Sequence, residues 1–256
     1  MKNIFLIPAL AIIMFFSSQT LIFADTITIV ADEWCPYGCA PDADKPGYGI
    51  EIAKKIFERA GHNIDYSIVP WARAVKLTRE GKYNAIIGAF VEDAPDFVFP
   101  ENEFGISQIT FFVKKGNLWK YTGIESLKPL KVGIILDYSY GDELDKYFKS
   151  ENAKSKVDIL SGKTPLDSNI KKLVGGRIDV TIEDMNVLNH TAKKMGLLDK
   201  VIIAGNAGKE NLYIAFSPAI PNSKQYAEIL SNGISQMRNS GELQTILSKY
   251  GLVDWK

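Results

Sequence analysis

Two charged residues lie where the sequence could place a ligand contact. Asp184 follows the apolar run 178–182, which has the composition of a buried strand, so we expect its carboxylate at the carboxyl end of that strand. It could contact a ligand there, ahead of its neighbour Glu183, or it could cap the helix predicted over 184–195. Arg73 lies one turn into another predicted helix. Its planar guanidinium could bind an anionic group through two hydrogen bonds, or it could be an ordinary surface charge.

Five aromatic residues form a second candidate set. Each lies just past a predicted strand or at the start of a predicted helix, in the first half of the chain. Rings at such positions could sandwich an apolar or cationic solute, although each ring could instead belong to the core. The residues are Trp34, Tyr37, Tyr48, Trp71 and Phe90.

The elements that would position these side chains follow from apolar periodicity, which predicts an α/β protein of two similar lobes. The segments 81–87 and 176–182 each join a helix to a strand through a glycine and a basic residue, and the order of strands and helices around them is repeated. Such alternation predicts mainly parallel sheets, with ligands bound beyond the carboxyl ends of the strands, in a cleft that a hinge can close. We place the two crossings between the lobes near 114–117 and 205–211.

The expected strands, read from β-branched and alternating runs, are 26–31, 64–69, 84–88, 106–113, 132–136, 157–160, 178–182, 201–204 and 212–216. The expected helices are 50–60, one opening at 70–71, and 141–148, 166–174, 184–195, 224–237 and 243–250.

The first 24 residues have the pattern of a secretory signal peptide. Lys2 precedes an uncharged apolar stretch from Ile4 to Phe16, and a short polar run leads to the small residue Ala24, after which we expect cleavage. An uncleaved membrane anchor is the alternative, because 4–24 approaches spanning length if its polar run lies within the membrane. Cleavage predicts a protein released into the periplasm.

The mature chain would carry little net charge. The sequence has 30 basic and 30 acidic residues, and cleavage removes Lys2 alone, which leaves a formal charge of −1. It contains no block of lysines or arginines, so the sequence gives no indication of binding to nucleic acid or to an anionic membrane surface. Its apolar content suffices for one large domain or two small ones.

The two cysteines, Cys35 and Cys39, have three residues between them. In an oxidising compartment the simplest prediction is a disulfide that pins this turn. A redox-active pair normally has two intervening residues. No Cys/His set at zinc-ligand spacing accompanies the pair, and His62 and His190 are isolated, so we expect neither a metal nor another cofactor.

Seven segments follow one another along the mature chain in a distinctive order and spacing. They are Ala31-Asp32-Glu33-Trp34, the run 46–53 (PGYGIEIA), Pro70-Trp71-Ala72-Arg73-Ala74, 81–88 (GKYNAIIG), Lys131-Val132-Gly133-Ile134, 176–184 (GRIDVTIED) and 241–247 (GELQTIL). Together they resemble the periplasmic solute-binding proteins of ABC importers, of the polar amino-acid type (extracellular solute-binding protein family 3).

The resemblance implies a type II periplasmic-binding-protein fold whose C-terminal helices return to the first lobe. The expected organisation is a signal peptide at 1–24, a first lobe of 25–114 plus 210–256, and a second lobe of 115–209. Family members often use the acid at the position of Asp184 to hold a ligand ammonium. They also use a small hydroxylated turn, here Tyr138-Ser139-Tyr140, whose backbone amides receive an anion, although these tyrosines could instead pack the lobe.

One departure from the family concerns the ligand. Amino-acid binders carry an arginine shortly after the glycine of the third strand, and it grips the ligand's α-carboxylate. Here Gly88 leads into Ala89 and Phe90 and then into an acidic stretch, 91–96, with no arginine. Arg73 is the nearest substitute.

The sequence therefore predicts a monomeric, exported binding protein that captures a small zwitterionic or cationic solute and passes it to the membrane permease of an ABC importer. It predicts no catalytic residue. Two alternatives remain open. One is an enzyme on the same fold, similar to exported cyclohexadienyl dehydratases, and the other is a ligand sensor that presents its bound state to a membrane receptor.

Overall fold

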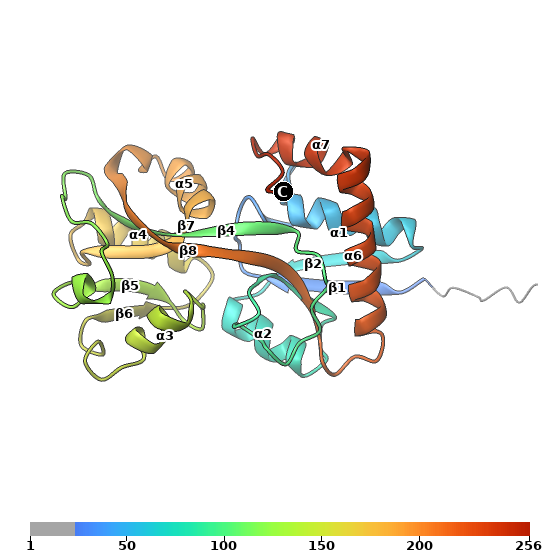
Figure 1. The fold of residues 1–256 in the computed structure, drawn as a ribbon, viewed down its shortest axis with the longest axis horizontal. Helices are drawn as coiled ribbons and strands as arrows, with labels where there is room; N and C mark the ends of the chain where they lie inside the picture. Colours follow the sequence, from blue (N-terminus) through green and yellow to red (C-terminus); the bar gives the residue numbers. More distant parts are fainter. Residues whose placement is uncertain (1–23) are drawn as a thin grey trace, which may run out of the picture.

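The computed structural model describes residues 24–256, which form two α/β lobes side by side (Figure 1). The predicted signal peptide, apart from Ala24, lies outside these residues. Eight strands make one curled sheet in the order β2-β1-β3-β8-β4-β7-β5-β6. The strands are β1 (Thr26–Ala31), β2 (Asn63–Ile68), β3 (Ala85–Ala89), β4 (Gly105–Lys114), β5 (Val132–Ile135), β6 (Val157–Leu160), β7 (Val180–Asp184) and β8 (Val201–Phe216).

Each lobe is built on three parallel strands. In the first lobe β1 pairs with β2 and β3, and in the second β5 pairs with β6 and β7. Helices flank both groups, and the C-terminal pair α6 and α7 packs against α1 of the first lobe (Figure 1). The helices are α1 (Tyr48–Arg59), α2 (Trp71–Arg79), α3 (Asp142–Phe148), α4 (Pro165–Val174), α5 (Met185–Lys194), α6 (Ser223–Ser240) and α7 (Glu242–Lys249).

The two helix-to-strand junctions that the sequence predicts have the same backbone geometry. Gly81 and Gly176 both take the left-handed conformation, with φ of 75° and 70°. In each junction the glycine N–H donates to the carbonyl three residues earlier, and the following basic residue donates to the carbonyl five residues earlier. This arrangement satisfies the free carbonyls at the ends of α2 and α4 and leads directly into β3 and β7.

The strands β4 and β8 connect the lobes, and they differ from the sequence prediction. We predicted separate strands at 201–204 and 212–216, because the intervening 205–211 is polar and contains two glycines; this prediction is wrong. β8 runs without interruption from Val201 to Phe216, since β4 pairs antiparallel with it along the whole crossing. Two shifts of register interrupt that pairing, between Ile109 and Thr110 and between Phe111 and Phe112.

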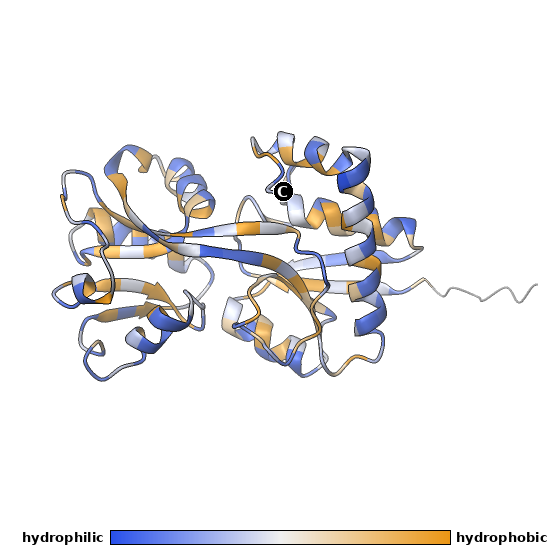
Figure 2. Cartoon of the chain, in the orientation of Figure 1, coloured by the Kyte–Doolittle hydropathy of each residue, from blue (hydrophilic) through white to orange (hydrophobic). Residues whose placement is uncertain are grey.

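The hydropathy pattern matches this layout. Apolar residues concentrate on the strands and on the helix faces that meet them, whereas the middle of β8, between the lobes, is polar (Figure 2). On α1, for example, Ile52, Ile56 and Phe57 are buried at helical spacing against the sheet and α6. Within residues 24–256, no helix combines the length and the apolar character needed to cross a membrane.

Candidate functional site

A small cavity lies between the two lobes, at the carboxyl ends of β1 and β3. Its volume is about 20 Å³, which is room for a group the size of one water molecule. Both lobes contribute to it, so any larger solute requires the lobes to move apart. Its walls are Asp32, Trp34, Trp71, Ile87, Gly88, Phe90, Asp93, Tyr138 and Ser139.

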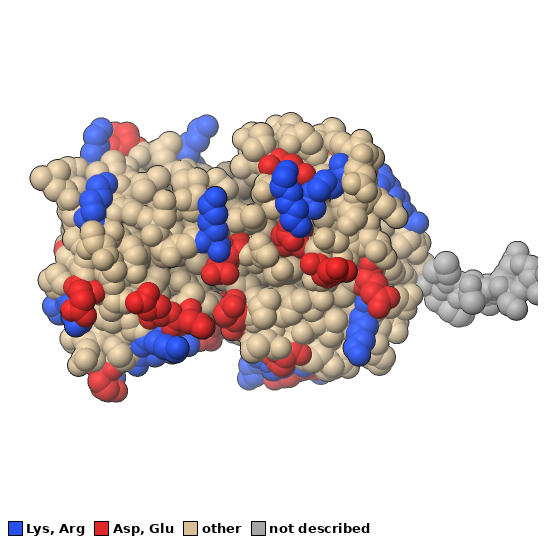
Figure 3. All heavy atoms as spheres, in the orientation of Figure 1, with Lys and Arg blue, Asp and Glu red and all other residues tan. Residues whose placement is uncertain are grey.

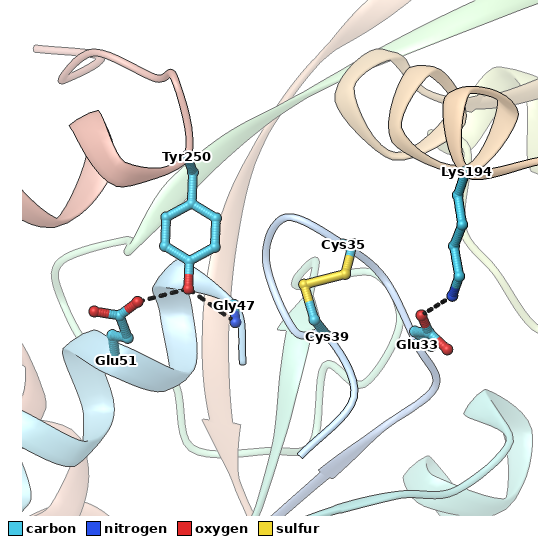
Figure 4. Close-up of a disulfide and its surroundings, with 7 residues drawn as sticks. All are labelled: Glu33, Cys35, Cys39, Gly47, Glu51, Lys194 and Tyr250. Carbon is cyan, nitrogen blue, oxygen red and sulfur yellow. Dashed lines mark hydrogen bonds and ion pairs between the residues drawn. A yellow bond between two sulfur atoms is a disulfide. The ribbon is translucent and has the colours of Figure 1, made fainter. Parts of the chain in front are cut away.

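The disulfide loop after β1 positions the first aromatic wall. Cys35 and Cys39 form the predicted disulfide, and the Trp34 N–H donates to the Gly38 carbonyl across the turn. The loop is tied to the start of α1, where the N–H groups of Tyr48 and Gly49 donate to the carbonyls of Pro36 and Tyr37. Beside it, the Gly47 N–H donates to the hydroxyl of Tyr250, and that hydroxyl donates to Glu51 (Figure 4). The disulfide and the hydrogen bonds to α1 fix the backbone that carries Trp34 at the cavity.

On the other side of this loop, an ion pair joins the lobes. The Lys194 Nζ at the end of α5 lies 2.8 Å from Oε1 of Glu33, which follows β1 (Figure 4). Both side chains are partly exposed to solvent.

A turn in the second lobe makes three consecutive contacts with the first lobe. The carbonyl of Asp137 accepts a hydrogen bond from Trp71 Nε1 at 3.0 Å, the Tyr138 hydroxyl donates to Asp32, and the Ser139 N–H donates to Asp93 Oδ1 at 3.0 Å. Asp137 has a φ of 60°, a conformation that costs energy for a residue other than glycine. The turn therefore fits closely against the first lobe.

Asp93 connects the cavity to a wider groove. One carboxylate oxygen accepts from the Phe90 N–H of its own loop, and the other accepts from Ser139. Asp93, Tyr138 and Ser139 also line a groove of about 540 Å³ that runs between α2 and the second lobe. This groove gives the cavity a neighbouring space that is large enough for the remainder of a small solute.

The acids at the end of β7 lie behind the cavity wall and are not among its lining residues. Glu183 Oε1 accepts from Trp34 Nε1 at 2.9 Å, while Oε2, although buried, has no hydrogen-bond partner within residues 24–256. Asp184 is fully occupied. One of its oxygens accepts from two N–H groups in the first turn of α5, and the other accepts from Tyr37, Ser107 and the backbone of Gln108.

Burial dominates the electrostatics of these carboxyl groups. It raises the pKa of Asp32 to about 6, that of Asp93 to about 7 and that of Glu183 to about 8. Nearby carboxylates add to the effect at Asp93 and Glu183, whereas hydrogen bonds donated to the acids oppose it. Burial likewise raises the pKa of Asp184, against its several hydrogen bonds.

The structure brings half of the sequence-predicted contact residues together around one cavity: Trp34, Trp71, Phe90, Tyr138 and Ser139. Tyr37 and Tyr48 are buried in the first lobe, where Tyr37 donates to Asp184 and Tyr48 packs on Phe104. Ala89 is buried in β3, and Arg73 is exposed on α2; neither lines the cavity. The ligand roles of these residues stay predictions.

Sequence reasoning missed two carboxyl groups that line the cavity. Asp32 and Asp93 both belong to segments that the sequence singled out, the end of the first strand and the acidic stretch after Gly88. Their position just past the carboxyl ends of β1 and β3 was the available signal. Among the described residues, no group of three His, Cys, Asp or Glu side chains has the arrangement of a metal site.

Comparisons with known proteins define the fold class. No family model and no curated protein matches the sequence. The chain is similar to a histidine kinase sensor domain that resembles periplasmic binding proteins, with 18% identity over 90% of this chain and 98% of that one and a TM-score of 0.74. The fold is thus that of the two-lobed periplasmic binding proteins, and it confirms the predicted fold class.

Binding proteins have the same architecture. An ancestral arginine-binding protein bound to arginine matches with 21% identity over 88% of this chain and 97% of that one, with a TM-score of 0.70. A chain from work on glutathione import via GshT and the cystine ABC importer TcyBC of Streptococcus mutans matches with 18% identity, over 90% and 97%, and a TM-score of 0.74. At these identities the likeness establishes the fold.

Proposed function

We propose that this chain is an exported, monomeric solute-binding protein that captures a small zwitterionic or cationic organic solute between its lobes and delivers it to the permease of an ABC importer. The observation that carries the proposal is the cavity itself. Its walls come from both lobes, so closure of the hinge encloses whatever occupies it. The architecture shared with an arginine-binding protein and with a protein studied in glutathione import supports the same function.

The charged and aromatic residues around the cavity support a polar organic solute. Trp34, Trp71, Phe90 and Tyr138 offer ring surfaces, and Asp32 and Asp93 offer hydrogen-bond acceptors. Small-molecule sites typically combine apolar walls with a few polar groups in this way.

Native mass spectrometry of the mature protein, purified from the periplasm under mild conditions, tests this function. We expect a co-purified small molecule, or a rise in the melting temperature with a member of a panel of amino acids, amines and small organic acids. Trp71→Ala should weaken binding of that compound at least 10-fold, whereas Trp119→Ala, which removes an indole outside the cavity, should not. A protein that binds nothing in the panel, or that converts a panel compound catalytically, would contradict the proposal.

A role as a ligand sensor is the second candidate, and the likeness to a histidine kinase sensor domain favours it. Both roles use the same cavity and the same closure, so binding data alone do not separate them. Co-purification of the ligand-loaded protein from detergent-solubilised membranes does: an importer permease among the retained proteins supports transport, and a receptor kinase supports sensing.

A further inference from the structure

The hydrogen-bond donors around the cavity are already in use, and this restricts the chemistry of the solute. The inference rests on the proposed function, because it concerns what the same cavity binds. The indole N–H of Trp34 is held by Glu183, that of Trp71 by Asp137, and the backbone N–H of Ser139 by Asp93. The donors that would receive a carboxylate are therefore occupied by acceptors of the protein itself.

The two hydroxyl groups of the lining are committed in the same way. Tyr138 donates to Asp32, and Ser139 Oγ donates to Asp145 Oδ2 at 2.8 Å. The lining contains no lysine, arginine or histidine, and Arg73 is exposed on α2. The cavity thus offers nothing to neutralise a negative charge on a solute, and a carboxylate buried without a partner is costly.

In contrast to these donors, the carboxyl groups that line the cavity can accept further hydrogen bonds. A carboxylate has about four lone-pair positions. Asp93 uses one position on each oxygen, for Phe90 and Ser139, and Asp32 accepts from Tyr138. Both acids line the cavity. A donor-rich cation is the complement of this set.

Aromatic rings from both lobes line the cavity, and two of them are in direct edge-to-face contact. Trp71 and Tyr138 come from different lobes and meet at nearly a right angle, with ring centroids 6.0 Å apart and an interplanar angle of 80°. Trp34 and Phe90 complete the walls. Ring faces attract cations through their quadrupole, and the attraction grows when the cation is removed from water.

The surface outside the cavity favours the same charge. Acidic atoms gather near the border of the two lobes, on the face that β8 crosses (Figure 3). Glu92, Asp142 and Glu210 are close enough that the pKa of Glu210, raised first by burial, is raised further by the other two carboxylates. Carboxylates at this border would favour the approach of a cation over that of an anion.

The wider groove carries both signs of charge. Lys76, Arg79 and Lys149 line it together with Glu92, Asp93, Asp137 and Asp145, and Arg79 is already paired with Asp96 through two hydrogen bonds. The groove therefore has no net preference for a carboxylate that would offset the preference of the cavity.

We propose that the solute is an organic amine or guanidine cation that carries no carboxylate group, with its charged head held by Asp32 and Asp93 against the aromatic walls of the cavity. The cavity of about 20 Å³ has room for an ammonium head group, a guanidinium head would require the lobes to part further, and the groove accepts the rest of the molecule. An amino acid that placed its α-ammonium in the cavity would be a poor ligand, since the attached carboxylate would lie beside Asp32 and Asp93.

Isothermal titration calorimetry with matched pairs tests the proposal on the mature wild-type protein. Cadaverine and lysine differ by one carboxylate, as do agmatine and arginine. We expect the carboxylate-free member of at least one pair to bind about 100-fold more tightly or better, equivalent to about 2.7 kcal/mol at a tenfold change per 1.36 kcal/mol. Asp93→Asn should weaken that binding at least 10-fold, whereas Asp65→Asn, which alters an exposed acid on β2 that lines neither the cavity nor the groove, should leave it unchanged.

The outcomes separate this inference from the proposed function. Equal or tighter binding of lysine or arginine overturns the inference and leaves a solute-binding protein. If neither pair binds, the ligand found in the wider panel decides: a carboxylate-free amine or guanidine supports the inference, while a carboxylate-bearing solute or a quaternary ammonium compound overturns it. A protein that binds no member of any panel contradicts the proposed function and the inference together.

Discussion

The strands β3 and β7 hold equivalent positions in the two lobes, and each is followed closely by an aspartate that reaches the other lobe. Asp93 follows β3; one of its oxygens accepts from its own loop, at Phe90, and the other from Ser139 of the second lobe. Asp184 ends β7; one oxygen caps α5 and the other accepts from Tyr37 of the first lobe, among others.

The two aspartates differ in how completely they are occupied. Asp184 accepts five hydrogen bonds and lies outside the cavity, whereas Asp93 accepts two and lines it. An aspartate near the carboxyl end of an equivalent strand can thus serve the fold in one lobe and remain available to a solute in the other. Free acceptor capacity at a cavity, rather than position alone, distinguishes the two roles.

The largest effect on stability is expected from removing Asp184, whose oxygens accept five hydrogen bonds. Asp184→Ala leaves the hydroxyls of Tyr37 and Ser107 and three backbone N–H groups without their acceptor, so we expect the free energy of unfolding to fall by about 3–5 kcal/mol. Asp93→Ala loses two bonds and should cost about 1–2 kcal/mol. Urea unfolding followed by circular dichroism measures both. Equal losses would show that the two acids do not differ as described.

A pH dependence of stability should follow from the raised pKa values. The folded-state pKa values of about 7 for Asp93 and about 8 for Glu183 exceed the ordinary values, so the folded protein holds more protons than the unfolded chain, and stability falls as pH rises. Between pH 6.5 and 8.5 we expect a loss of about 2–3 kcal/mol, or a melting temperature lower by about 5–10 °C.

The control for this dependence is Glu183→Gln, which keeps the shape of the side chain and removes its titration. Most of the loss above pH 7 should disappear in this variant, and Asp93 should account for the remainder. A wild-type melting temperature that stays constant or rises over this interval would contradict the raised pKa values of these two buried acids.

An intermediate effect is expected from the disulfide, whose loop carries Tyr37 to Asp184 and Trp34 to the cavity. The double substitution Cys35→Ser and Cys39→Ser should lower the free energy of unfolding by about 2 kcal/mol, because the bond closes a short loop. Unfolding measured under non-reducing conditions tests this. If reduction of the wild-type protein has no effect on the midpoint, the bond does not constrain this loop.

The smallest effect is expected at the solvent-exposed contact between the lobes. Lys194 pairs with Glu33, but its side chain is 62% exposed, so Lys194→Ala should change stability by less than about 1 kcal/mol. The comparison with Asp184→Ala separates a buried connection between the lobes from an exposed one. If Lys194→Ala lowered the free energy of unfolding as much as Asp184→Ala does, the exposed ion pair would stabilise the contact between the lobes far more than its exposure predicts.

Much of the fold was predictable because it depends on local patterns. Residues 157–160 form a strand as predicted, α1 follows its apolar spacing, and the junctions at Gly81 and Gly176 have the geometry that a glycine and a basic residue indicate. The continuous course of β8 was not predictable in this way. Its middle is polar and rich in glycine, and its extended form depends on pairing with β4, which is distant in the sequence.

The site was predictable in its aromatic walls and less so in its acids. Trp34 and Trp71 flank strand ends, which is a local signal, and both line the cavity. Asp184 has the same signal, but its occupancy depends on Tyr37, Ser107 and Gln108, whose proximity only the fold creates. Whether an acid is available to a ligand is a property of its neighbours in space.

The pair of long strands that joins the lobes has a mechanical consequence. β4 and β8 remain hydrogen-bonded through the crossing, so the lobes are joined by a pleated ribbon rather than by two flexible linkers. The register shifts near Ile109 and Phe111 are places where such a ribbon bends and twists most easily. Opening and closing should therefore be a hinge bending of this ribbon along one preferred direction. The two faces of the cleft would then meet in the same alignment at every closure.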